Sequence, residues 1–153
     1  MRYCPVRELP AYAFRPGQHT HPNKEGGHSF GNSEVHSSAL SIENPDFLYA
    51  IDLFNHDYYW EAHVYLEAIW NFHKRVGPEA IFCKALIKIC AAALKEEISA
   101  DDESARGHFE RAIELVNQLD ESPIKNFSKV KILDLIKKRQ NATKEVIKLE
   151  TIS

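Results

Sequence analysis

The sequence has few cysteines, and their positions argue against a disulfide framework. The three cysteines are Cys4, Cys83 and Cys90, and the last two fall within one expected helix. Seven residues along a helix separate two Cα atoms by about 10 Å, which is farther than the roughly 7 Å that a disulfide can span. We therefore expect buried free thiols, which fit the reducing cytosol, and we predict a cytoplasmic protein.

The sequence also lacks any apolar run long enough to span a membrane, and its start has no apolar signal core. The formal net charge is −3, so the chain has no overall excess of basic residues of the kind that nucleic-acid binders carry. The basic run KKRQ at residues 137–140 is a local exception, which we interpret as a solvated helix face. We therefore expect neither a membrane nor a nucleic acid as a partner.

The composition of the chain changes at about residue 40. Residues 1–40 hold four of the seven prolines, four of the six glycines and four of the eight histidines. Their apolar residues follow neither the helical nor the strand period, but aromatic residues such as Tyr3 and Phe14 can anchor the segment. We predict an extended, irregular N-terminal arm over residues 1–40, packed on a single helical-bundle domain over residues 41–153.

Residues 41–153 predict an all-α fold, a bundle of about five helices. Asn44 and Pro45 are typical of a helix start, and Asp57 is expected to cap the second helix. The third helix is apolar nearly all round in the stretch IFCKALIKICAAAL, so we expect it at the centre of the bundle. The expected helices span residues 45–55, 58–75 and 79–97, a fourth from 99–102 to about 119, and a last one over 128–149.

The stretch FNHDYYWEAHVYLEAIW, residues 54–70, holds the candidate site. On a helical wheel, a stripe at i, i+3, i+7 and i+10 runs beside the apolar core stripe; it consists of Trp60, His63, Glu67 and Trp70. His63 and Glu67 are i,i+4 neighbours that can touch. An imidazole beside a carboxylate can transfer a proton or bind a metal. A purely structural pair, which satisfies two polar groups, explains the same pattern.

Glu61, which points away from this stripe, and two lysines of the third helix add further charges. Lys84 and Lys88 are i,i+4 neighbours in an otherwise apolar segment, so they need a carboxylate or a route to water. Glu61 or Glu67 across the helical hairpin can supply the carboxylate. Two interpretations stay open: ordinary inter-helix salt bridges or snorkelling, and an anion pocket made by the lysines with His63.

The arm contains HTH at residues 19–21 and GGH at residues 26–28. His19, His21 and His28 are candidate metal ligands, together with His63, although their spacing matches no standard zinc pattern. The paired glycines equally offer backbone amides to an anion. These patterns do not identify a cofactor.

Two segments resemble a known family. FRPGQHTHPNKEGGHSFG, residues 14–31, is similar to the N-terminal signature of the small helical proteins called domain of unknown function 309, and LFNHDYYWEAHVYLEAIW, residues 53–70, is similar to their central motif. The resemblance covers most of the chain and implies an all-helical bundle with no assigned activity. The residues that match the two motifs are Glu61, Ala62, His63, Glu67 and Trp70 in the centre, and Pro16, Gly17, His21, Pro22, Gly27, His28 and Ser29 in the arm. The family often has glutamines where this chain has Lys84 and Lys88.

These patterns leave two functional hypotheses. The first is a ligand- or protein-binding module with a groove that is edged by His63 and Glu67. Its expected lining residues are Trp60, Trp70, Lys84, Lys88, His21 and His28. The alternative is a small hydrolase-type enzyme, metal-assisted or acid–base, that uses His63 with Glu61 or Glu67. We favour the module because no complete catalytic constellation is visible. Its ligand or protein partner is unknown, and self-association of the chain stays open.

Overall fold

Among the residues that the structure describes, five helices form the body of the protein. The computed structural model describes residues 2–15, 38–98 and 102–150. The helices are α1 (Pro45–Asn55), α2 (Tyr59–Phe72), α3 (Pro78–Ile98), α4 (Asp102–Asn117) and α5 (Lys129–Gln140). These residues include no strand, which confirms the predicted all-α bundle. None of the helices in the described ranges is long and apolar enough to cross a membrane.

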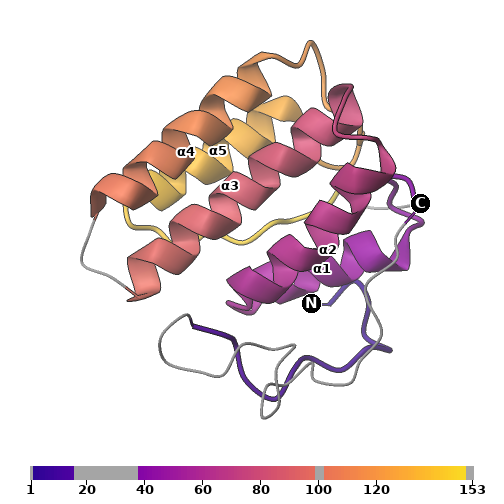
Figure 1. Cartoon of the computed structure of the whole chain (residues 1–153), viewed down its shortest axis with the longest axis horizontal. Helices are drawn as coiled ribbons and strands as arrows, with labels where there is room; N and C mark the ends of the chain where they lie inside the picture. Colours follow the sequence, from indigo (N-terminus) through magenta and orange to yellow (C-terminus); the bar gives the residue numbers. More distant parts are fainter. Residues whose placement is uncertain (1, 16–37, 99–101, 151–153) are drawn as a thin grey trace.

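The helices are arranged in two layers (Figure 1). α3 lies between α2 and α4 in one layer and packs against both of them. α1 packs on α2, and α5 packs on α4, so these two helices form the layer behind. α3 is therefore the central helix, as its apolar sequence predicted.

The cysteines of α3 are part of the core. Cys83 and Cys90 are buried free thiols, which confirms the prediction from their spacing. Burial raises the pKa of each thiol to about 12. Because the reactive form of cysteine is the thiolate, these two side chains fill space and do not act as nucleophiles near neutral pH.

Asp57 corrects one prediction. It was expected to cap α2, but the N-cap position of α2 is Tyr58, which makes no side-chain cap hydrogen bond. Asp57 instead ends α1, with a φ of 71° and its N–H donating to the Phe54 carbonyl at 3.1 Å. Its carboxylate accepts hydrogen bonds from the Tyr59 hydroxyl and from Lys144 Nζ, each at 2.9 Å. The carboxylate therefore joins segments that are far apart in the sequence, which local spacing does not reveal.

α5 is shorter than predicted. It ends at Gln140, whereas apolar spacing predicted a helix to residue 149. Ala142 has a φ of 62°, and the N–H of Thr143 donates to the Lys138 carbonyl at 2.9 Å, which is a Schellman ending. Glycine usually occupies this left-handed position, so an alanine there gives no stop signal in the sequence. The chain after α5 runs back across the molecule as an extended tail (Figure 1).

Residues 2–15 lie against α1 and α2. Asp52 of α1 is fully buried, and its carboxylate accepts hydrogen bonds from the backbone N–H groups of Tyr3 and Cys4, both at 2.7 Å. Arg2 Nε donates to the same carboxylate at 3.2 Å. Side chains of the helical body thus hold the described start of the predicted arm. The division into an arm over residues 1–40 and a domain over 41–153 stays a prediction.

Candidate functional site

The core stripe of α2 fixes the rotation of the helix. This stripe is buried, as predicted, and consists of Tyr59, Ala62, Leu66 and Ile69. A helix held in this way leaves the neighbouring stripe at the boundary between core and solvent. All four predicted site residues on that stripe are half-buried: Trp60, His63, Glu67 and Trp70.

The predicted His–Glu pair forms at this boundary. His63 Nε2 lies 3.2 Å from Glu67 Oε1, and the ring Nδ1 hydrogen-bonds to the Trp60 carbonyl. The indole of Trp60 packs edge-on against the imidazole, with ring centroids 5.4 Å apart. Both ring nitrogens therefore face oxygen acceptors, and the ring can donate to both only when it carries two protons. The side chains of His63 and Glu67 are 28% and 44% exposed, so a group from solvent can reach them.

Glu61 lies on a different side of α2, under the N-terminal segment. It is only 4% exposed, and its Oε2 accepts a hydrogen bond from the Phe14 N–H at 2.7 Å. The Phe14 ring packs on Trp60 with centroids 5.1 Å apart. The helical wheel alone leaves Glu61 at the helix surface, and the burial comes from a segment that wheel analysis does not include. Glu61 therefore anchors the N-terminal segment to α2.

Lys84 of α3 lies over an aromatic ring of α2. Its Nζ is 4.3 Å from the centroid of the Trp70 indole, and the guanidinium of Arg75 is 4.7 Å from the same centroid. Both distances fall within the range of cation–π attraction. The two predicted binding residues Trp70 and Lys84 are thus brought together across the α2–α3 hairpin.

Positive charges gather around Lys84. Burial lowers the pKa of Lys84, and the nearby charges of Lys88, Arg75 and Arg111 lower it further, while Glu67 opposes them. A lowered lysine pKa means that the protonated form is disfavoured, here first by burial and then by the neighbouring positive charges. These residues, with Trp70 of α2, form one face of the molecule, which is made by α2, α3 and α4. Most charged residues named on this face are basic, although the net charge of the whole chain is negative.

α4 contributes residues that sequence reasoning missed. The pKa of His108 is lowered by burial and then by the charges of Lys88 and Lys95, so this ring belongs to the same face. Arg111 also belongs there, and it pairs with Glu114 at 3.0 Å. The i,i+3 spacing of His108 and Arg111 beside the apolar stripe of α4 was the signal that could have found them.

The structure describes only one of the four histidines that were predicted as metal ligands, His63. Within residues 2–15, 38–98 and 102–150, no group of three or more His, Cys, Asp or Glu side chains is arranged to hold a metal ion. His19, His21 and His28 lie outside the described residues, so their roles as metal ligands or, for His21 and His28, as lining residues stay predictions.

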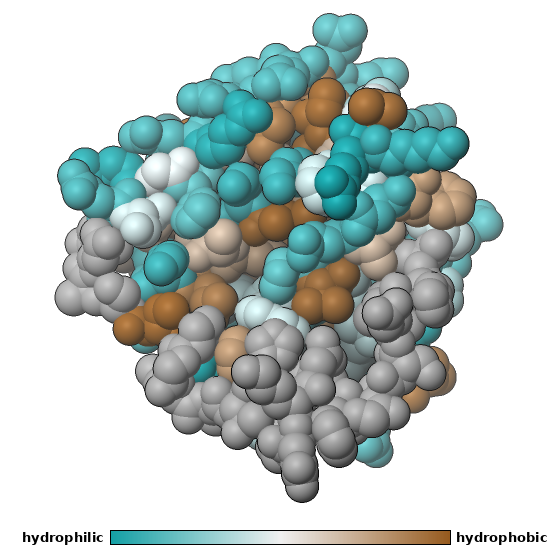
Figure 2. All heavy atoms as spheres, viewed as in Figure 1, coloured by the Kyte–Doolittle hydropathy of each residue, from teal (hydrophilic) through white to brown (hydrophobic). Residues whose placement is uncertain are grey.

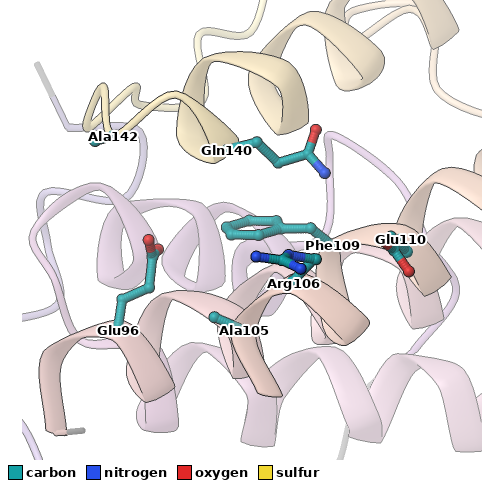
Figure 3. Close-up of a pocket in the computed structure, with 7 residues that line it drawn as sticks. All are labelled: Glu96, Ala105, Arg106, Phe109, Glu110, Gln140 and Ala142. Carbon is teal, nitrogen blue, oxygen red and sulfur yellow. The ribbon is translucent and has the colours of Figure 1, made fainter. Parts of the chain in front are cut away.

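A separate pocket of about 420 Å³ opens between the end of α3, α4 and the end of α5 (Figure 3). The ring of Phe109 lies in its middle, with Gln140 on one side and Arg106 on the other (Figure 3). Glu96 and Glu110 flank this ring. The volume falls in the range of small-molecule sites, but the lining contains none of the residues that the sequence predicted.

Most of the surface on these helices is polar. On the face in Figure 2, hydrophilic side chains cover the helices and hydrophobic ones show through in separate spots. Among the described residues, the exposed large hydrophobic side chains lie in three segments, two of them at the α2–α3 connection: Val6, Phe72, Val76 and Val130.

The fold and this face define a small all-helical protein in which lysines of α3 lie near Arg75 and near Arg111 of α4. Residues 47–106 match the family model described as Domain of unknown function (DUF309), so the chain carries a DUF309 domain over these residues, which confirms the resemblance of the central motif. The arm motif at residues 14–31 lies outside the match. The match covers α1 to α3 and the first residues of α4, and it includes His63, Glu67 and Lys84. Comparison with curated proteins and with solved structures found no match.

Proposed function

We propose that the protein is a binding module that holds a phosphate- or carboxylate-bearing ligand on the face made by α2, α3 and α4. One observation carries the proposal. Lys84 and Arg75 lie over the indole of Trp70, and Lys88 and Arg111 lie near enough to Lys84 to lower its pKa, in a chain whose formal net charge is −3. Proteins concentrate charge of one sign where they attract a ligand of the opposite sign.

The chemistry of this face suits an anion with a flat or apolar part. The ring of Trp70 offers an aromatic surface, and Lys84 already lies over it. Burial is the main cause of the lowered pKa of Lys84, and an anion beside the lysines offsets the further lowering by the neighbouring positive charges. His63, held by Glu67 and partly exposed, supplies a further donor at the edge of the face.

The hydrolase-type alternative has less support. His63 and Glu67 form a pair with a geometry that suits proton transfer. A hydrolytic site also needs a nucleophile or a metal and a group that stabilises the developing charge. Within the described part of the chain, no third acidic, histidine or cysteine side chain joins this pair to make a metal site.

The test uses pyrophosphate as the probe and Trp70 as the reporter. The chain has two tryptophans, so Trp60→Phe leaves Trp70 as the single indole. In this background, fluorescence is followed while pyrophosphate is added to three proteins: the parent, K84Q/K88Q, and the control K125Q/K137Q. The control removes the same charge from two exposed lysines outside the face.

We expect saturable binding to the parent and to K125Q/K137Q, and binding that is weaker by about tenfold or more in K84Q/K88Q. Added salt should weaken the binding, because part of the attraction comes from exposed charges. Equal weakening in both double variants would mean that pyrophosphate senses only overall charge, which contradicts the proposal.

A further inference from the structure

The tail after α5 is bound to the body as an extended peptide. Residues 143–150 form neither a helix nor a strand, and they run back across the molecule (Figure 1). The tail is nevertheless well held, because its backbone makes hydrogen bonds to four other parts of the chain. Residues 145, 147, 149 and 150 each use a backbone N–H or carbonyl group in this way.

Asn55 of α1 binds both backbone groups of one tail residue. The Ile147 N–H donates to Asn55 Oδ1 at 2.7 Å, and Asn55 Nδ2 donates to the Ile147 carbonyl at 2.8 Å. A side-chain amide offers one acceptor and two donors, so it can satisfy a peptide unit much as a neighbouring strand does. This contact does not depend on the identity of the tail side chain.

Asn126 also binds both backbone groups of one tail residue, through its own backbone carbonyl and its side-chain amide. The Glu150 N–H donates to the Asn126 carbonyl at 2.8 Å, and Asn126 Nδ2 donates to the Glu150 carbonyl at 3.0 Å. Between the two asparagines, the Leu149 N–H donates to the Tyr3 hydroxyl at 2.9 Å. We call the surface that holds the tail the groove; its hydrogen bonds come from Tyr3 in the N-terminal segment, Asn55 of α1 and Asn126 in the loop before α5.

The side chains of the tail alternate in burial. Ile147 and Leu149 are 2% and 7% exposed, while Lys148 and Glu150 between and after them are exposed. Alternation is the pattern of an extended peptide with one face on a surface. The groove therefore binds a segment with an extended backbone and with apolar side chains at two alternate positions.

We propose that this groove is a docking site for an extended peptide segment of a partner protein with two aliphatic residues at alternate positions, and that the chain's own tail occupies it as an internal ligand. The tail provides the template for that partner. Main-chain hydrogen bonds with pockets for alternate side chains are a known mode of peptide recognition.

The test frees the groove in the full-length chain. The variant I147D/L149D places two charges where the groove is apolar, so the tail should leave it. The probe is a capped peptide with the sequence TKEVIKLE of residues 143–150 and a fluorescent label, and binding is followed by fluorescence anisotropy. The control T143D/K148D also introduces two aspartates into the tail, but at exposed positions.

We expect the peptide to bind I147D/L149D about tenfold or more tightly than wild type or T143D/K148D, because their own tails compete for the groove. Adding N55A to I147D/L149D should weaken the binding, since it leaves peptide groups without partners. A labelled peptide with aspartates at the two apolar positions should not bind. If I147D/L149D keeps its helical circular dichroism and does not bind TKEVIKLE, the proposal is overturned.

A second measurement applies if I147D/L149D does not fold. Excess TKEVIKLE is added to wild type, and hydrogen exchange of the Ile147, Leu149 and Glu150 amides is measured. Faster exchange supports displacement of the tail, and unchanged exchange overturns the proposal. A concentration-dependent dimer that exchanges tails while ignoring free peptide would assign the groove to a second copy of the chain, and this result also overturns it.

Discussion

Asp52 of α1 binds the backbone of Cys4, with its Oδ2 2.7 Å from the Cys4 nitrogen. The carboxylate has no exposed surface, and the first residues of the chain cover it. Residues 2–15 lie outside the DUF309 match, yet they complete the surroundings of a buried charge inside it. The N-terminal segment is therefore part of the stable fold of this chain.

Asp52→Ala should destabilise the protein by about 3 kcal/mol. The change leaves two backbone N–H groups without their charged acceptor, and hydrogen bonds to charged groups are among the stronger ones. The control is Asp46→Ala, which removes a partly exposed pair with Arg7 and should cost about 1 kcal/mol or less. Urea unfolding of the three proteins measures both values. Equal losses for the two variants would contradict the role of Asp52.

The buried thiols predict a loss of stability at alkaline pH. Cys83 and Cys90 have a folded-state pKa of about 12, against 9.0 for an unperturbed thiol. Above pH 9 the unfolded chain releases these protons while the folded chain keeps them. The contribution of the two protonated thiols to the free energy of unfolding is therefore fully present below pH 9. It is lost as the pH rises towards 12, by at most about 1.4 kcal/mol per pH unit for each thiol.

The pH effect is measured as the free energy of unfolding at pH 8, 9 and 10. The control variant C83A/C90A should show a shallower fall above pH 9, whatever its stability at pH 8. Some fall should remain, because burial also raises the pKa of Tyr49 to about 12. An identical slope in the variant and in wild type would show that the thiols do not cause the effect.

The two described glycines predict opposite effects of alanine. Gly107 lies inside α4, and an added Cβ meets no atom within 4 Å, so Gly107→Ala should stabilise by about 0.5–1 kcal/mol. Gly77 has a φ of 91°, where alanine is strained, so Gly77→Ala should destabilise by about 1 kcal/mol or more. Thermal unfolding of both variants checks the signs, and a stabilising Gly77→Ala would contradict the turn geometry.

Sequence patterns predicted the elements better than their ends. The helical period identified five helices and the core stripe of α2, because burial of one face sets that period. Three helices end with left-handed residues other than glycine, namely Asp57, Lys74 and Ala142. None of these is a stop signal in a sequence, so α5 was predicted too long, and the role of Asp57 was misassigned.

The site was predictable where it depends on one helix and not where it depends on tertiary contacts. The i,i+4 spacing of His63 and Glu67 was sufficient to predict their contact. The burial of Glu61 depends on Phe14, which is 47 residues away in the sequence. A helical wheel contains no information about a segment that crosses the helix from elsewhere in the chain.

Ala142→Gly should stabilise the protein by about 0.5–1 kcal/mol. The left-handed conformation costs an alanine about 1–2 kcal/mol, and glycine removes this cost. Glycine also makes the unfolded chain more flexible, which offsets about 0.5–1 kcal/mol of the stabilisation. The control is Ala91→Gly inside α3, which should destabilise by about 1 kcal/mol. Urea unfolding measures both changes. If Ala142→Gly is as destabilising as Ala91→Gly, residue 142 continues the helix, and α5 extends towards residue 149 as its apolar spacing predicted.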